Sequence, residues 1–195
     1  MVYTNMTVYA SMAEIFADID AVRGRIYECT ERLSPAQVCF KRSADSWSVA
    51  EILEHLGKAD RRILQRICET LAPAEAPGNC ASPAQFAPFC LEAHIKDAWD
   101  QGLKAPDHLV PVGGLTVDEL LEEMRRGRAE FLSHRPRFEA HDLSQLSFPH
   151  PYFGTMNLYQ WLAFVAMHEN RHLRQIESLL SAPGFPTVDV RLEQH

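Results

Sequence analysis

The sequence predicts an all-α protein folded as a four-helix bundle. Four long stretches carry apolar residues at three- and four-residue steps, which gives each stretch one apolar face when it is helical. Two of these stretches begin with a capping box, and the chain shows no convincing strand pattern and no internal repeat. At 195 residues the chain is long enough for one core, so we expect a single domain over residues 1–195.

The first helix is expected from about Ser11 to Leu33. Its apolar stripe consists of Met12, Ile15, Phe16, Ile19, Val22, Ile26 and Tyr27. Ser34 and Pro35 follow, and because serine is a good N-cap and proline suits the first helical position, they predict a short helical turn.

The second helix is expected to begin at Ser46-Trp47-Ser48 and to reach about Leu71. Ser48 and Glu51 have the spacing of a capping box. The apolar stripe consists of Ile52, Leu56, Ala59, Ile63 and Ile67. His55 borders this stripe at its seam with a charged face. A ligand at the mouth of a bundle would occupy such a position, and so would an ordinary surface histidine.

Residues 72–114 are rich in proline and glycine, which excludes one unbroken helix there. We expect an irregular connection that folds over one end of the bundle, with a short helix near residues 91–101. Loops of this length often line a site. The connection is long enough for the helices on either side of it to be parallel or antiparallel, and the residues alone do not choose.

The third helix is expected from Thr116, which forms a capping box with Glu119, to about Ser133. A loop should follow over residues 135–155. It contains His150 and Tyr152, which could reach the site on the last helix from this loop, although most histidines in loops are merely solvated.

The last helix, from about Asn157 to Ser181, contains His168 and His172 within an apolar run. Four residues apart on a helix, the two rings lie on one face, about 40° apart around the axis. Two neutral imidazoles one turn apart can bind one metal ion. The alternative is a pair of core histidines that hydrogen-bond to the backbone or to Glu169.

Glu169 falls within the same inward sector as the two histidines. It is a candidate for orienting a ligand histidine or for acting as a base. The alternative is a carboxylate paired with an arginine such as Arg61 or Arg62. The residues after the last helix, 184–195, form a tail without periodicity.

Residues 168–172 also spell H-E-x-x-H, the helix of zinc peptidases, in which the glutamate is the general base. The metzincin continuation is missing, because Gln175 and Ser178 stand where glycine and histidine would be needed. Other such peptidases take a downstream acidic ligand from another helix, and here only the tail residues Asp189 and Glu193 remain. A zinc peptidase is therefore the least favoured alternative.

The composition indicates where the protein is located and which kinds of partner it does not bind. The net charge of −7 argues against a nucleic-acid partner, and no stretch has the roughly 20 apolar residues that cross a bilayer. No signal peptide is evident. The five cysteines are odd in number and lack a C-x-x-C pair, which favours reduced thiols in a cytoplasmic protein.

Three motifs resemble the DinB-like (DinB/YfiT-like) family of bacterial four-helix metalloproteins. They are Trp47-Ser48-x-x-Glu51-x-x-x-His55-Leu56, the Pro149–Gly154 stretch, and His168-x-x-x-His172 with Leu173 and Gln175-Ile176. The resemblance implies a left-handed up-down-down-up bundle and a divalent metal ion, zinc, nickel or iron, held by His55, His168 and His172. Relatives include thiol-dependent S-transferases and maleylpyruvate isomerases, and a homodimer is common among them.

The resemblance and the residues together predict a metal-dependent enzyme acting on a small molecule, either like a thiol S-transferase or like a hydrolase. Three imidazoles leave an open coordination position, at which water or a thiol can be activated. A low-molecular-weight thiol is a candidate co-substrate. The alternative from a different class is a bundle of the same fold that binds a metal or a ligand without chemistry.

Overall fold

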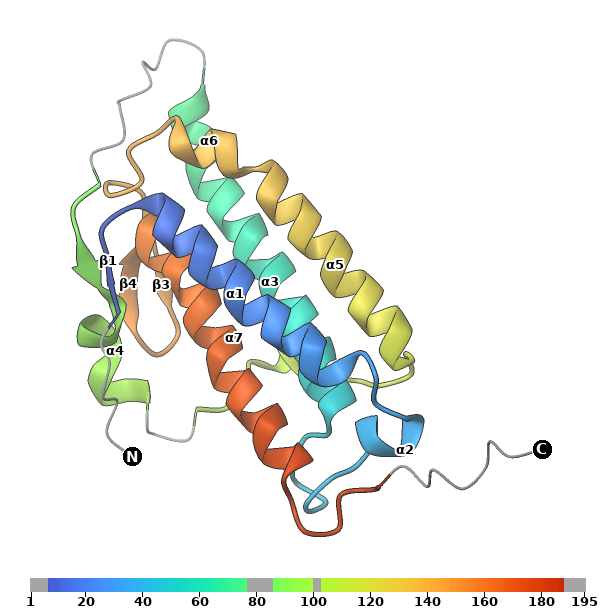
Figure 1. Cartoon of the computed structure of the whole chain (residues 1–195). Helices are drawn as coiled ribbons and strands as arrows, with labels where there is room; N and C mark the ends of the chain where they lie inside the picture. Colours follow the sequence, from blue (N-terminus) through green and yellow to red (C-terminus); the bar gives the residue numbers. More distant parts are fainter. Residues whose placement is uncertain (1–6, 77–85, 100–102, 188–195) are drawn as a thin grey trace.

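Four long helices form the body of the computed structural model, which describes residues 7–76, 86–99 and 103–187. They are α1 (Met12–Thr30), α3 (Val49–Leu71), α5 (Val117–Ser133) and α7 (Leu158–Leu180). In Figure 1, α1 and α7 run in one direction, and α3 and α5 run in the opposite direction. The protein is thus an all-α four-helix bundle with the up-down-down-up order.

The long connection between α3 and α5 makes this order possible, because it returns the chain along the length of the bundle (Figure 1). It contains a 3-10 helix η1 (Ala72–Glu75), the helix α4 (Leu91–Trp99) and a second 3-10 helix η2 (Asp107–Leu109). The short helix predicted near residues 91–101 corresponds to α4. The two-residue strand β2 (Phe89–Cys90) precedes α4, and the connection is otherwise irregular in its described parts, as its prolines require.

Side-chain caps fix where the helices begin. The predicted capping boxes are present at Ser48 in α3 and at Thr116 in α5. Two further boxes begin α7, at Asn157, and the short helix α2 (Pro35–Val38), at Ser34. In each box the cap side chain accepts from a backbone N–H and the residue three positions later returns a bond to the cap, so two otherwise unpaired donors are satisfied.

Short elements that the sequence analysis did not foresee cover one end of the bundle. Strand β1 (Val8–Tyr9) pairs with β2 (Phe89–Cys90), and β3 (Ser147–His150) pairs with β4 (Gly154–Asn157), both antiparallel. Helix α6 (Arg135–Glu139) precedes the hairpin. The expectation of a plain loop over residues 135–155 was therefore wrong, because strands of two to four residues are too short to show an alternating pattern.

The apolar core consists of two clusters, one toward each end of the bundle. One contains Ile15, Ile67, Phe131 and Leu162, and the other contains Ile26, Leu53, Leu121 and Ile176, among other residues. On every long helix a buried charged residue lies in sequence at or next to the boundary between the clusters. These residues are Arg23, Asp60, Arg128 and Glu169. Polar groups therefore mark the middle of the bundle, where all four helices contribute.

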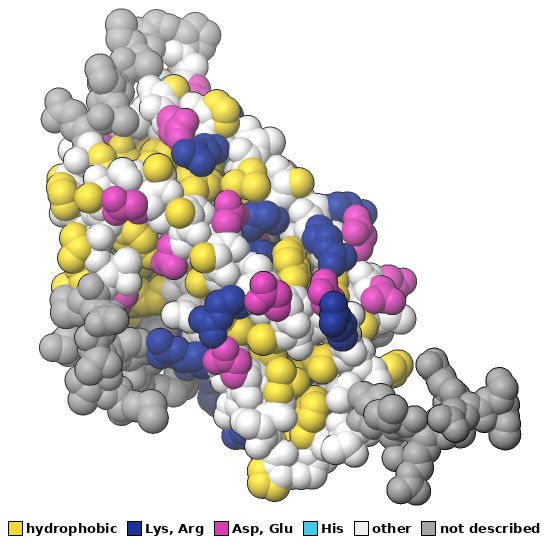
Figure 2. All heavy atoms as spheres, viewed as in Figure 1, with side chains coloured by type: hydrophobic (Ala, Val, Ile, Leu, Met, Phe, Trp, Pro, Cys, Tyr) yellow, Lys and Arg dark blue, Asp and Glu magenta, His cyan; other side chains and the backbone are white. Residues whose placement is uncertain are grey.

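The face of the bundle seen in Figure 2 mixes basic and acidic side chains. Among the described residues, no helix combines the length and the apolarity needed to cross a membrane. Cys29, Cys39, Cys68 and Cys90 are free thiols, whereas Cys80 lies outside the described residues.

Candidate metal centre

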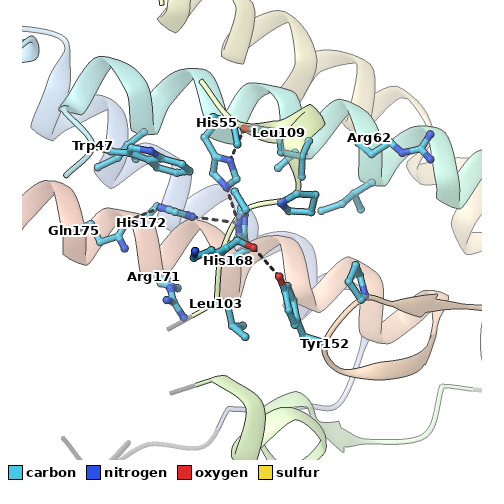
Figure 3. Close-up of a pocket in the computed structure, with 18 of the residues that line it drawn as sticks. Trp47, His55, Arg62, Leu103, Leu109, Tyr152, His168, Arg171, His172 and Gln175 are labelled. Atoms are coloured by element: carbon cyan, nitrogen blue, oxygen red, sulfur yellow. Dashed lines mark hydrogen bonds between the residues drawn. The ribbon is translucent and has the colours of Figure 1, made fainter. Parts of the chain in front are cut away.

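Three imidazole rings converge at the middle of the bundle. His55 comes from α3, and His168 and His172 come from α7 (Figure 3). The Nε2 atom of His168 lies 3.2 Å from Nε2 of His55 and 3.2 Å from Nε2 of His172. His55 is 3% exposed and His172 is 6% exposed, so the interpretation of His55 as a surface histidine was wrong.

Hydrogen bonds on the far side of two rings fix their tautomers. Nδ1 of His55 donates to the backbone carbonyl oxygen of Leu109 at 2.9 Å, and Nδ1 of His172 donates to Oε1 of Gln175 at 2.7 Å. A neutral imidazole carries one N–H, so Nε2 of each of these rings presents a lone pair. Both lone pairs are directed at Nε2 of His168.

The three rings cannot satisfy one another by hydrogen bonds alone. Nε2 of His168 has one position for a proton and can donate to only one of its two neighbours. Nδ1 of His168 is buried and has no hydrogen-bond partner among the described residues. Three nitrogens around a tetrahedral ion with bonds of about 2.0–2.1 Å would lie about 3.3 Å apart. The two separations of 3.2 Å, in a set of ligand atoms that all lie within 4.8 Å of one another, therefore suit a shared divalent cation.

Burial keeps the three rings in the neutral form that binds metals. It lowers the pKa of His55, and it lowers the pKa of His168 well below the usual range, with His172 and His55 adding to the effect. Burial and the neighbouring His55 lower the pKa of His172 to about 3. Because protons and metal ions compete for the same lone pairs, such shifts favour a metal ligand over an imidazolium.

The end of the connection between α3 and α5 holds the Leu109 carbonyl in place. The Glu54 carboxylate accepts from the backbone N–H groups of Val112 at 3.0 Å and Gly113 at 2.9 Å. The Lys58 ammonium donates to the carbonyl oxygen of Val110 at 2.9 Å. Two side chains of α3, one on each side of His55 along the helix, thereby fasten the segment that orients His55.

A pocket of about 1040 Å³ opens beside the three rings. The later part of the connection lines it from Leu103 to Val110, which confirms that this region borders the site. His150 and Tyr152 also line it, so of the two alternatives for this stretch, reaching the site or being merely solvated, the structure favours the first. Burial lowers the pKa of His150 to about 4. The Tyr152 hydroxyl donates to the carbonyl oxygen of Lys104 at 3.0 Å, which ties the hairpin to the connection (Figure 3).

Three residues that contact the histidines were missed from the sequence. The ring of Trp47 stacks on that of His172, with centroids 6.2 Å apart and an interplanar angle of 17°. It also lies 4.8 Å from the ring of His55 and lines the pocket. Gln175 could have been identified, because a side chain three residues after His172 lies on the same face of the helix. The Leu109 carbonyl could not, since every residue has one.

Glu169 belongs to a different buried cluster. Its carboxylate accepts from Nε of Arg23 at 3.1 Å and from Nη2 of Arg128 at 2.7 Å. Arg23 also contacts Asp60 through Nη2. We refer to Arg23, Asp60, Arg128 and Glu169 as the charged quartet, and to His55, His168 and His172 as the histidine triad.

Glu169 therefore has arginine partners, although not the ones expected. Arg61 instead contacts Glu123, and Arg62 contacts Gln65. Nδ1 of His55 and of His172 bond elsewhere and Nδ1 of His168 is unbonded, so Glu169 makes no orienting hydrogen bond to the triad. Burial raises the pKa of Glu169, against the opposing effect of Arg23. Burial alone would lower the pKa of Arg23, but Asp60 and Glu169 raise it well above its usual value.

The fold and the triad define a class of protein: four-helix bundles with three converging histidines, one on the second long helix and two on the last. A family profile described as the DinB superfamily matches residues 18–176. The chain belongs to this superfamily.

The chain is also similar to individual proteins. It is 27% identical over 148 residues to the uncharacterized protein YuaE of Bacillus subtilis, which covers 75% of this chain and 85% of YuaE. The four-helix bundle protein TT2238 superposes with a TM-score of 0.60 at 18% identity, covering 86% of this chain and 99% of TT2238.

YfiT of Bacillus subtilis, described as a probable metal-dependent hydrolase with an unusual four-helix bundle topology, has a TM-score of 0.60 at 13% identity. The alignment covers 92% of this chain and 91% of YfiT. At these identities the two solved structures show a shared fold.

Proposed function

We propose that the protein is a metal-dependent enzyme acting on a small molecule, with His55, His168 and His172 as the ligands of a divalent zinc, nickel or iron ion. One observation carries the proposal: Nε2 of His168 lies 3.2 Å from Nε2 of both His55 and His172, and it has one proton for these two contacts. The orienting bonds from Leu109 and Gln175 are those that ligand histidines usually make on their second nitrogen.

The pocket supports an enzymatic role over a purely structural ion. Three protein ligands leave a coordination position open, and the pocket borders the triad at that level of the bundle. A divalent ion held there supplies Lewis acidity, which polarises a substrate and makes water or a thiol a better nucleophile. The pocket volume of about 1040 Å³ suits a small molecule.

Hydrolysis and thiol transfer are the two reaction classes we propose. The description of YfiT as a probable metal-dependent hydrolase supports the first by analogy. The second needs a low-molecular-weight thiol as co-substrate. A peptidase of the H-E-x-x-H type is less favoured, because both Glu169 oxygens accept hydrogen bonds from arginines. Asp189 and Glu193, the downstream acids considered for that alternative, lie outside the described residues.

Metal content and thermal stability test the proposal. Protein purified without chelator and without a histidine tag should contain about one metal ion per chain. After chelation, added zinc or nickel should raise the stability by about 2.7 kcal/mol at a free concentration 100 times the dissociation constant. Both effects should be lost in His55→Ala and His168→Ala.

The matched control is His94→Ala, because His94 is exposed on α4 and does not line the pocket. This variant should bind metal as the wild type does. A wild-type protein that takes up no stoichiometric metal and gains no stability from added zinc, nickel or iron would contradict the proposed function. Equal metal binding in His55→Ala would contradict the assignment of the ligands.

A further inference from the structure

The pocket beside the triad is basic, although the chain as a whole is acidic. The chain has 19 lysines and arginines against 26 aspartates and glutamates. Among the described residues that line the pocket, six are basic and two are acidic. The basic residues are Arg42, Arg62, Arg66, Lys104, Arg171 and Arg174, and the acidic ones are Asp45 and Asp107. The sign of the charge is thus reversed at the pocket.

The outer surface distributes its charges differently. Its arginines lie beside carboxylates, as in the pairs Arg25–Glu177 at 2.5 Å and Arg61–Glu123 at 3.5 Å. Figure 2 shows the two signs interleaved on one face. Interleaved charges of this kind keep a protein soluble and cancel over short distances. Among the described lining residues, the basic side chains outnumber the acidic ones, and a concave site strengthens the field of such an excess.

The basic residues lie on both sides of the triad. In Figure 3, Arg171 lies beside His168 and His172 on α7, and Arg62 lies further along α3, past the segment that carries Leu109. Arg62 donates to the neutral amide of Gln65 at 3.2 Å. Arg42 donates to Oγ of Ser178 at 2.6 Å. Neither of these contacts neutralises the positive charge.

Aromatic rings form another part of the pocket wall. They belong to Trp47, Phe148, Tyr152, Phe153, Trp161 and Phe164. The guanidinium of Arg66, which pairs with Glu69, lies 5.2 Å from the centre of the Phe148 ring. A site that combines aromatic walls with guanidinium groups binds molecules that have an apolar body and an anionic group.

We propose that the substrate is a small organic anion, with a carboxylate, phosphate or sulfonate group bound by the arginines and an apolar part against the aromatic walls. This inference deepens the proposed function and rests on it, since the arginines would hold the anion next to the metal ion. Arginine presents a planar fork of donors that matches such groups. The overall charge of −7 disfavours extended polyanions, so the ligand is small.

A pair of fluorescent probes that differ in one charge tests the inference on the intact, metal-free protein. 8-Anilinonaphthalene-1-sulfonate has an aromatic body and a sulfonate, and N-phenyl-1-naphthylamine is its neutral counterpart. Fluorescence titration should give a dissociation constant for the sulfonate about tenfold lower than for the amine. Raising the salt concentration should reduce the difference.

Variants locate the binding to the pocket. The double variant Arg62→Gln/Arg171→Gln should weaken sulfonate binding about tenfold and leave binding of the neutral probe nearly unchanged. The control Arg61→Gln/Arg125→Gln removes the same charge from exposed positions, which pair with Glu123 and Glu31. It should change neither constant more than about twofold. Circular dichroism and urea unfolding should show both double variants folded.

The outcomes separate this inference from the proposed function. Equal affinity for the two probes, or equal sulfonate affinity in the two double variants, would overturn the organic-anion substrate even if zinc binds the triad. A sulfonate preference that depends on Arg62 and Arg171 supports an anion pocket. If zinc, nickel and iron then all fail to bind, the metal-dependent function is wrong and the anion pocket stands alone.

Discussion

The histidine triad and the charged quartet are two buried polar clusters at the same level of one bundle, and they contain consecutive residues of α7. His168 belongs to the triad and Glu169 to the quartet. The quartet joins all four long helices and balances two positive with two negative side chains. The triad joins two helices, consists of histidines alone, and borders a pocket.

The difference shows how burial can separate a structural cluster from a functional one. Burying charges is tolerated when each charge has a partner, as in the quartet. The three neutral imidazoles of the triad carry too few protons to form a hydrogen bond at each of their close N···N contacts. A further group such as a metal ion is needed to satisfy these nitrogens. We therefore expect changes in the quartet to act on folding, and changes in the triad and its surroundings to act on metal binding.

The largest effect is expected from Arg23→Met, which keeps an apolar stem but leaves Asp60 and Glu169 without their shared partner. Two buried carboxylates would then face each other with Arg128 as the remaining cation. Breaking a buried ion pair from one side costs about 3–5 kcal/mol. Urea unfolding of the metal-free protein measures this loss in the free energy of unfolding.

Arg25→Met is the control for Arg23→Met, since Arg25 lies on the same helix and pairs with Glu177 in an exposed position. The loss there should be about 0–1 kcal/mol. Similar losses in the two variants would mean that the quartet is not a special stabilising element. The charged quartet could then no longer be distinguished from the triad by a role in folding.

Much of this fold followed from local sequence, because apolar periodicity and capping boxes are properties of neighbouring residues. The four long helices and their starts were predicted in this way. The partners of Glu169 were not, since Arg23 is 146 residues away and nothing local selects it. The parallel direction of α3 and α5 also depends on packing rather than on local residues, because the long connection permits either direction.

The site was predictable to different degrees. The spacing of His168 and His172 placed both rings on one inward face. His55 lay at the edge of its helix stripe, so its inclusion came from the resemblance to a family. The hairpin that carries His150 was missed, because four-residue strands that turn at Gly154 give no periodic signal.

Gln175→Leu sharpens the comparison at the triad, because it removes the acceptor of the His172 Nδ1 proton without touching a proposed ligand. Losing such an orienting bond typically costs about 10–100-fold in metal affinity. Zinc titration against a competing chelator measures the change, and stability without metal should change little. Gln175→Glu keeps an acceptor at this position and should retain zinc affinity, so equal weakening in the two variants would contradict the orienting role.

His150→Gln tests whether the pocket side of the bundle is sensitive to acid. The folded-state pKa of His150 is about 4, below the value of about 6.5 in an unfolded chain. As the pH falls below about 6.5, the unfolded state takes up the proton first, so this residue destabilises the native state increasingly down to about pH 4. Between pH 7 and pH 5 the wild type should lose about 1–2 kcal/mol more than His150→Gln.

Urea unfolding of the metal-free protein at the two pH values measures this difference. The other histidines are common to both proteins, so their contributions cancel. His94→Gln, at an exposed position on α4, should follow the wild type. An equal fall in stability for the wild type and for His150→Gln would show that His150 is not held neutral by burial.

The smallest effect is expected from Glu54→Gln, which acts on the triad only through the backbone. The variant weakens the bonds to the N–H groups of Val112 and Gly113 and removes the ion pair between Glu54 and Lys58, while the Lys58 ammonium still donates to the Val110 carbonyl. The Leu109 carbonyl should become less well fixed against Nδ1 of His55, which lowers zinc affinity by about threefold. Glu69→Gln, an exposed change on the same helix, should have no effect. Unchanged zinc affinity in Glu54→Gln would show that the triad is organised by α3 and α7 alone, and that the connection merely lies over it.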